Sequence, residues 1–173
     1  MDGKHRSFQE QVEKQPDYRY DVRNEIIINN DTMIFEEEYN VKVLMLNGSA
    51  KANGNTYASL LEVGRQLEKE GIEYEIFQMG GEPVRDCLGC GQCTENGCVF
   101  ADDKVNEFVA KAKEADGFVF GTPVYYAHPS GRVMSFLDRA FYSSGSAAFA
   151  FKPGASVAVA RRGGTTASFD AMN

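Results

Sequence analysis

The sequence predicts an α/β fold built on a parallel sheet that helices cover on both faces. Apolar runs of strand length alternate with helical patterns from Val41 onward, which indicates consecutive βαβ units. The first run, VKVLML at 41–46, is almost continuously apolar, as a strand buried on both faces should be. Ligands of such sheets bind outside the carboxyl ends of the strands, so the residues that follow each strand are the functional candidates.

The predicted elements follow one another without an internal repeat. Strands are expected at 41–46, 72–77, 117–124 and 155–160, and helices at about 55–70, after Asp102 or Asp103, after Ser130 and after Gly164. The first helix is predicted most clearly, because its apolar residues recur on one face. These residues are Tyr57, Leu60, Leu61, Gly64 and Leu67. The next two helices repeat the pattern with Val105, Phe108, Val109 and Ala112, and with Val133, Phe136, Leu137 and Ala140.

Residues 1–40 form an N-terminal extension that precedes the α/β domain of residues 41–173. Two short apolar runs flank an Asn/Asp turn at 29–31, which predicts a β-hairpin at 25–36. An extended arm that docks on a partner subunit and a weakly ordered extension remain alternatives. The extension holds ten acidic and five basic residues, a net charge of −5 out of −7 for the whole chain.

Charge and hydropathy argue against two classes of partner. The net charge is −7 and the basic residues form no stripe, so no nucleic-acid partner is expected. No apolar run reaches the roughly 18 residues of a membrane span, so no membrane partner is expected. The polar N-terminus lacks the apolar core of a signal peptide, and we therefore expect a cytoplasmic protein whose thiols stay reduced.

The loop after the first strand, NGSAKANGNT at 47–56, has the composition of a phosphate site. Helix N-termini attract anions, and Ser49, Lys51, Asn55 and Thr56 add hydroxyl, amide and ammonium donors there. The loop matches neither GxxxxGK[ST] nor GxGxxG, so a monophosphate fits better than a nucleoside triphosphate or a dinucleotide. A plain Gly/Asn turn before a capped helix is the alternative.

The loop after the third strand, GTPVYYAHPSG at 121–131, offers flat apolar faces. Tyr125 and Tyr126 follow Pro123 and Val124, and a planar ring system can lie against such a segment. The alternative is that both tyrosines are ordinary partly buried aromatics. His128 has no visible carboxylate partner, so a structural role is favoured over proton transfer.

The segment RRGGTT follows the fourth predicted strand. Gly163 and Gly164 are free to present backbone N–H groups, and Arg161 is placed to lie near an electron-rich ring edge. The alternative interpretation of the arginines is a solvated basic pair.

All four cysteines lie in one twelve-residue segment, at Cys87, Cys90, Cys93 and Cys98. The spacing C-x₂-C-x₂-C-x₄-C resembles the compact four-thiolate loop of a [4Fe–4S] cluster, although its last gap differs from the ferredoxin pattern. Zinc sites separate two C-x₂-C pairs by a longer spacer, and a reducing compartment disfavours disulfides. Free thiols remain the main alternative to a cluster.

Four segments together resemble the NADPH-dependent FMN reductase family, which has a flavodoxin-like fold. They are LNGSAKANGNT at 46–56, the cysteine segment from Cys87 to Cys98, GTPVYYAHPSGRVMSFLDRAF at 121–141 and ARRGG at 160–164. Within the family, the chain is most similar to iron-sulfur flavoproteins and their cluster-free relatives. The resemblance covers residues 41–173.

The resemblance implies a role for each of the loops. The first loop binds the FMN phosphate through Ser49, Asn55 and Thr56, with Lys51 nearby. The third loop packs on the isoalloxazine through Pro123, Val124, Tyr125 and Tyr126, and Gly163, Gly164 and Arg161 bind the pyrimidine edge. The family implies no catalytic side-chain acid or base, and none is assigned here.

The resemblance also implies a sheet of strand order 2-1-3-4-5, whereas four strands are predicted after Val41. We therefore expect the chain to be truncated at its C-terminus relative to that fold, unless the N-terminal hairpin supplies additional sheet.

The function implied is an FMN-dependent oxidoreductase. It would pass electrons from NAD(P)H through the flavin, with or without a [4Fe–4S] cluster, to a quinone, another flavin or a redox protein. Family members associate, so a homodimer or higher homo-oligomer is expected. The alternatives are a flavodoxin-like electron carrier that never oxidises a nicotinamide, and a non-redox binding module that has lost FMN.

Overall fold

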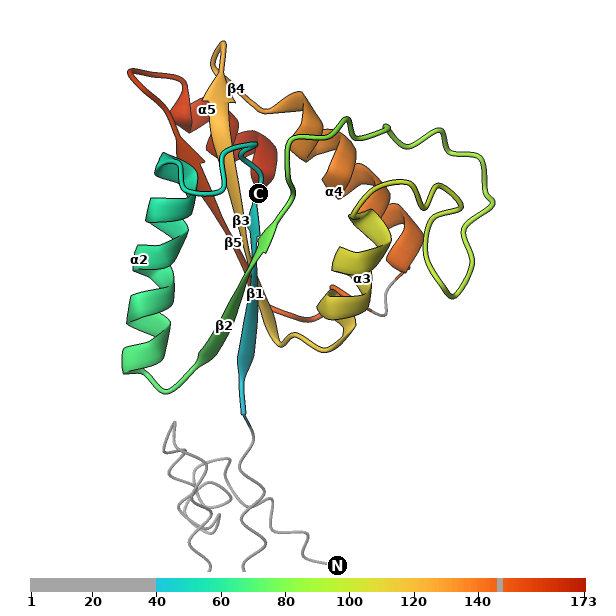
Figure 1. Ribbon diagram of the computed structural model, residues 1–173, viewed down its shortest axis with the longest axis horizontal. Helices are drawn as coiled ribbons and strands as arrows, with labels where there is room; N and C mark the ends of the chain where they lie inside the picture. The colour runs from blue at the N-terminus through green and yellow to red at the C-terminus, as the bar shows by residue number, and fades with distance from the viewer. Residues whose placement is uncertain (1–39, 146–147) are drawn as a thin grey trace, which may run out of the picture. The chain divides into compact units, whose positions relative to one another are not determined.

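The computed structural model describes residues 40–145 and 148–173, so the predicted hairpin at 25–36 lies outside the described residues. The described chain forms five strands, β1 to β5, and four helices, α2 to α5 (Figure 1). In order they are β1 (Lys42–Asn47), α2 (Asn55–Lys69), β2 (Glu73–Gln78), α3 (Val105–Lys113), β3 (Gly117–Tyr125), β4 (His128–Pro129), α4 (Gly131–Ser144), β5 (Gly154–Val159) and α5 (Thr165–Met172). Among the described helices, none is long and apolar enough to cross a membrane.

The sheet has the predicted doubly wound topology. Four strands run parallel in the order β2-β1-β3-β5, with β4 antiparallel to the end of β3. Because β5 is the fourth of the predicted strands, this order confirms the first four positions of the expected 2-1-3-4-5 sheet. The register aligns Asn47 with both Gln78 and Gly121, and Pro123 with Val159, so the carboxyl ends of all four parallel strands lie at one edge.

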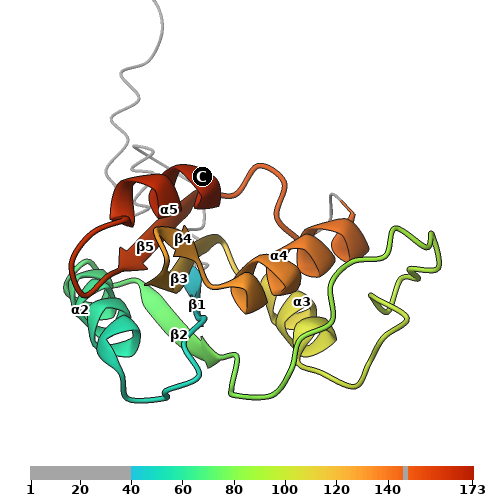
Figure 2. The same cartoon turned by 90° about the horizontal axis from the view of Figure 1, so that it is seen from above.

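The core consists of two apolar layers on opposite faces of the sheet. Figure 2 shows α2 on one face and α3 and α4 on the other. Leu44, Leu46 and Phe120 point to the face covered by α3 and α4, where Phe108 and Phe136 form an edge-to-face pair with centroids 5.3 Å apart. Met45, Val119 and Leu60 form the smaller layer beneath α2. The alternation of Leu44, Met45 and Leu46 between the layers explains why the β1 sequence is almost continuously apolar.

The segment after the third predicted strand differs from the loop that was expected. β3 continues to Tyr125 and folds back into β4 as a hairpin, with Tyr125 opposite His128 and Val124 opposite Pro129. The two residues between, Tyr126 and Ala127, both have positive φ, at 52° and 59°. A two-residue type I′ turn requires such angles, but it favours Asn or Gly, so the sequence carries no signal for this turn.

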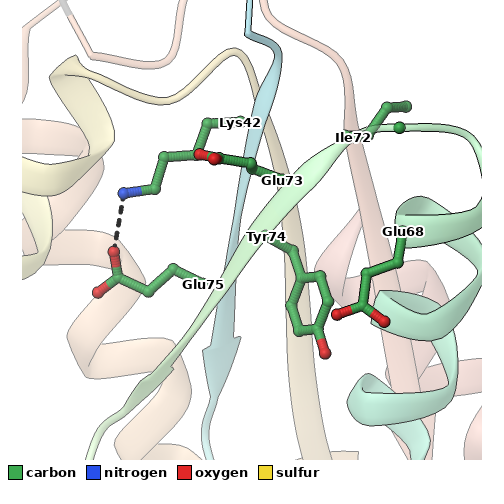
Figure 3. Close-up of a pocket in the computed structure, with 7 residues that line it drawn as sticks. Lys42, Glu68, Ile72, Glu73, Tyr74 and Glu75 are labelled. Atoms are coloured by element: carbon green, nitrogen blue, oxygen red, sulfur yellow. Dashed lines mark hydrogen bonds and ion pairs between the residues drawn. The ribbon is translucent and has the colours of Figure 1, made fainter.

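A hollow of about 700 Å³ lies at the opposite edge of the sheet, where β1 and β2 begin (Figure 3). Glu75 projects beside it and accepts hydrogen bonds from Lys42 of β1 at 2.9 Å and from Lys111 of α3 at 2.8 Å. Hydrogen bonding to Lys111, and then to Lys42, outweighs burial and lowers the pKa of Glu75. These contacts tie α3 to the sheet, and they lie far from the loops at the carboxyl edge.

We expect Glu75→Gln to lower the stability of the domain at neutral pH by about 0.5–1 kcal/mol, a modest loss because the ion pairs are partly exposed. A carboxylate with a lowered folded pKa stabilises fully above its unfolded pKa of about 4.3, and the contribution disappears as pH falls through the folded value. Urea unfolding at pH 7 and at pH 3 measures the difference. An equal gap between wild type and variant at both pH values would contradict the assignment.

Candidate functional site

Three loops that carry the predicted site residues lie together at the carboxyl edge of the sheet (Figure 1). They are the β1–α2 loop, the β3–β4 hairpin and the turn between β5 and α5. The first is joined to β3 by a hydrogen bond from Gly48 N to Gly121 O at 2.9 Å. The second and third touch directly, because a Cβ built on Gly164 would lie 2.4 Å from Ala127 Cα. Strand ends remote in sequence are thereby brought into one surface.

Two amide side chains, the buried Asn47 and the half-buried Gln78, set the shape of the β1–α2 loop. Asn47, at the end of β1, accepts a hydrogen bond from Ser49 N at 3.2 Å and donates to Gln78 of β2. Gln78 in turn donates to the carbonyl oxygen of Ser49 at 2.7 Å. The sequence reasoning missed both residues, although a polar residue ending an apolar strand is a signal for Asn47. Their pairing across 31 positions needs the sheet register.

The start of α2 is open to an anion. Its N-cap is Gly54, and no side chain of the described residues caps it. Ser49 and Thr56 are nearly buried, whereas Lys51 and Asn55 are exposed. The Ser49 hydroxyl accepts a hydrogen bond from Lys51 N at 3.2 Å, which leaves its proton to donate. This arrangement of an uncapped helix terminus beside hydroxyl and amide groups fits a phosphate.

The β3–β4 hairpin presents its aromatic residues outward. Tyr125 is 60% exposed and Tyr126 is fully exposed, while Pro123 and Val124 are half-buried. The base of the hairpin is fixed by Thr122, whose hydroxyl accepts a hydrogen bond from Ser130 N at 3.1 Å. A bulky residue with positive φ, such as Tyr126, is strained, and strain of this kind concentrates at ligand sites.

The remaining candidates at this edge differ in their surroundings. Arg161 and Gly163 are exposed, and Gly164 is the left-handed N-cap of α5 with φ of 93°. His128 is exposed, and its Nδ1 lies 3.2 Å from the carbonyl oxygen of Pro129. This contact is with the adjacent residue of the chain, and the structural role favoured for His128 stays a prediction.

The cysteine segment runs between β2 and α3 on the side of the sheet that α3 and α4 cover (Figure 2). All four cysteines are free thiols; Cys90 is exposed and the other three are half-buried. Burial, together with the neighbouring Cys98 and Cys90, raises the pKa of Cys93. Among the described residues, however, no three Cys, His, Asp or Glu side chains are gathered closely enough to hold a metal ion. Four cysteine thiolates are the donors that a [4Fe–4S] cluster takes, but the described structure does not bring their sulfurs together.

Comparison with known proteins places the domain in a family context. Residues 41–173 match the model of a family described as NADPH-dependent FMN reductase. An iron-sulfur flavoprotein of Methanocaldococcus jannaschii is 37% identical over 100 residues, which are 57% of this chain and 51% of that protein. An FMN-dependent NADPH-azoreductase of Staphylococcus saprophyticus is 30% identical over 100 residues, again 57% of this chain and 51% of that protein. The chain spans about half the length of the curated relatives it matches.

Solved structures share the fold. The NAD(P)H:quinone oxidoreductase of Methanothermobacter marburgensis superposes with a TM-score of 0.56 at 12% identity, over 72% of this chain and 68% of that one. At this level of identity the likeness concerns the fold alone, and it confirms the flavodoxin-like sheet. The family match confirms the resemblance that the four sequence segments carry.

Proposed function

Because the chain belongs to the NADPH-dependent FMN reductase family, we propose that it binds FMN and passes electrons from NAD(P)H through it to a small-molecule acceptor or a redox protein. The observation that carries the proposal is the meeting of three loops at one sheet edge, with the uncapped N-terminus of α2 among them. The chemistry that FMN supplies when bound is hydride acceptance and release of electrons singly or in pairs. The chain's own part is to bind, orient and shield the ring.

The first loop is proposed to hold the FMN phosphate. The backbone N–H groups of α2 donate to it, with Ser49, Asn55 and Thr56 as side-chain donors and Lys51 as a nearby charge. The Asn47–Gln78 pair supports this role by fixing the Ser49 backbone from behind the loop.

The hairpin and the turn before α5 are proposed to hold the ring system. Tyr125 and Tyr126, with Pro123 and Val124 at their base, offer the apolar face that a planar ring packs against. Arg161, Gly163 and Gly164 are proposed to donate to the pyrimidine edge. Contact between Gly164 and Ala127 supports the joint action of the two segments.

The cysteine loop is proposed to hold a [4Fe–4S] cluster through Cys87, Cys90, Cys93 and Cys98. Support comes from the four thiols within one segment and from the similarity to a protein named as an iron-sulfur flavoprotein. Free thiols are the alternative, and the similarity to a protein named as an azoreductase is compatible with them. Association of two or more copies stays a prediction from the family resemblance.

The test of the proposed function is anaerobic reduction of the purified, FMN-loaded chain by NADPH or NADH. We expect either nucleotide to bleach the yellow absorbance of the flavin. Added quinone should then reoxidise the flavin and restore the absorbance. Bleaching by a protein donor but not by a nicotinamide would favour the electron-carrier alternative. A chain that takes up no FMN would favour the binding-module alternative.

A further inference from the structure

Cys98 is held in place by α3, unlike the three cysteines that precede it. Its backbone N–H donates to Asn106 Oδ1 at 2.8 Å, and Asn106 Nδ2 donates to the Cys98 carbonyl oxygen at 2.8 Å. Just before it, Thr94 and Gly97 exchange two backbone hydrogen bonds of 2.9 and 3.0 Å, which close a tight turn. Asn106 belongs to a helix packed in the core, so the Cys98 backbone has a fixed position.

The residue at position 97 has to be glycine for this clamp to form. Gly97 has φ of 107°, and a Cβ built on it would lie 2.5 Å from Asn106 Oδ1. A side chain at this position would therefore push away the oxygen that receives the Cys98 N–H.

The sulfur of Cys98 is contacted from the other side by a buried cation of α4. Arg139 is 1% exposed, and its Nε donates to Cys98 Sγ at 3.3 Å. Its Nη2 donates to Phe100 O at 2.6 Å, and its Nη1 donates to Arg85 O at 3.4 Å and to the Asp103 carboxylate. A buried guanidinium is tolerated only with such a full set of partners. Most of these partners belong to the segment that carries the cysteines, so Arg139 fastens that segment to α4.

The other three cysteines have no comparable anchoring. Cys90 is exposed, Cys87 and Cys93 are half-buried, and the described residues contain no cluster of three metal-ligating side chains. One sulfur is thus fixed by hydrogen bonds, and the described structure shows no such contacts for the other three.

We infer that Cys98 is the preorganised ligand of the cysteine loop and that Arg139 is its positioning residue, donating an N–H···S hydrogen bond to the bound sulfur. This inference rests on the proposed function, because it takes the loop to hold a [4Fe–4S] cluster. Cys87, Cys90 and Cys93 would supply the other three thiolate ligands.

Two measurable consequences follow from the position of Arg139. A partner that orients a metal ligand raises metal affinity, and loss of such a partner costs about 10- to 100-fold. A cationic donor to a ligand sulfur also favours the reduced, more negative cluster, so it raises the reduction potential. The second consequence separates action on the sulfur from simple stabilisation of the fold.

The experiment compares wild type with Arg139→Gln, Arg139→Lys and Asp103→Asn in the full 173-residue chain. Each protein is reconstituted anaerobically with ferric iron, a thiol reductant that supplies the ferrous equivalents, and sulfide, and iron content, iron affinity and the midpoint potential of the cluster are measured. We expect about four iron atoms per wild-type chain, a 10- to 100-fold weaker affinity in Arg139→Gln, and a more negative potential. Arg139→Lys keeps the charge and should recover part of the potential.

The controls distinguish the ways in which the inference can fail. Asp103→Asn removes the ion pair but leaves the Nε to Sγ hydrogen bond, so its potential should not become more negative as that of Arg139→Gln does. Arg65→Gln, at an exposed position of α2, shows the effect on the potential of losing a positive charge that does not contact the cysteines. Equal shifts in Arg139→Gln and Asp103→Asn, or no shift in either, would overturn the inference. A wild-type chain that binds no iron would overturn it together with the proposed cluster, while NADPH bleaching would still test the flavin function separately.

If Arg139→Gln does not fold, the comparison is made between wild type, Arg139→Lys and Asn106→Ala. Asn106→Ala releases the Cys98 backbone without touching the sulfur contact, so it should weaken iron affinity and leave the potential of loaded protein close to wild type. A potential shift in Asn106→Ala as large as that in Arg139→Lys would contradict a specific role for the guanidinium.

Discussion

Replacement of Gly48 by alanine is expected to abolish tight FMN binding and to destabilise the domain by several kcal/mol. A Cβ at this position would lie 2.2 Å from Val133 Cγ2 and 2.6 Å from the carbonyl oxygen of Gly121. The first clash is with α4 and the second is with the β3 backbone, so neither neighbour can move without moving a core element. Overpacking costs roughly 1–3 kcal/mol, and a clash with a backbone carbonyl lies at the upper end or beyond.

The FMN effect follows from what Gly48 connects. Its N–H donates to Gly121 O, and the next residue is Ser49, which the Asn47–Gln78 pair holds in place. Displacement of Gly48 therefore moves the phosphate loop away from the β3 end of the proposed site. Fluorescence titration with FMN and urea unfolding measure the two effects.

Gly81→Ala is the matched control, because nothing in the described residues lies within 4 Å of its built Cβ and its φ is not in the left-handed region. It should leave both FMN affinity and stability close to wild type. The double variant Gly48→Ala/Val133→Ala removes only the side-chain clash, so it should recover part of the stability. Full FMN affinity in Gly48→Ala would refute the placement of the phosphate loop.

The parallel sheet and its loop positions could be predicted because they depend on local patterns. Apolar runs and helical periodicity locate β1 and α2 to within a residue or two. Ser130 is the N-cap position of α4 as expected, although its side chain makes no capping hydrogen bond in the described structure. The N-cap of α3 is Lys104 and not Asp102 or Asp103 as expected, although Asp103 accepts a hydrogen bond from Val105 N at 3.1 Å.

What the sequence could not provide are contacts that exist only once distant segments meet. Arg139 lies beside the predicted apolar face of α4, and by residue type it would be taken as solvent-exposed. It is buried because the segment from 85 to 103 folds over it and supplies carbonyl and carboxylate acceptors. Gln78 likewise ends a half-exposed strand and gains its role only from its register beside Asn47.

The Gly164→Ala variant is expected to weaken FMN binding about tenfold or more. It should also destabilise the domain, but less than Gly48→Ala does. Two penalties coincide at this position. Gly164 has φ of 93°, where a side chain costs roughly 1–2 kcal/mol. A Cβ would also lie 2.4 Å from Ala127 Cα, in the strained turn of the β3–β4 hairpin. The turn before α5 and the β3–β4 hairpin would therefore have to move apart. The two sets of residues proposed to contact the ring would move apart with them. A loss of 1.4 kcal/mol in binding corresponds to a tenfold change.

The structure offers a control that separates the two penalties. Gly71 has φ of 73°, and nothing in the described residues lies within 4 Å of its built Cβ. Gly71→Ala should therefore show the backbone strain alone: a stability loss of roughly 1–2 kcal/mol in urea, smaller than that of Gly164→Ala, with FMN affinity unchanged. Gly164→Asn relaxes the strain, since asparagine tolerates the left-handed region, but retains the clash with Ala127. If the contact between the loops shapes the ring site, Gly164→Asn binds FMN as weakly as Gly164→Ala. If it binds like wild type, the two loops act independently and the proposed ring site has to be divided between them.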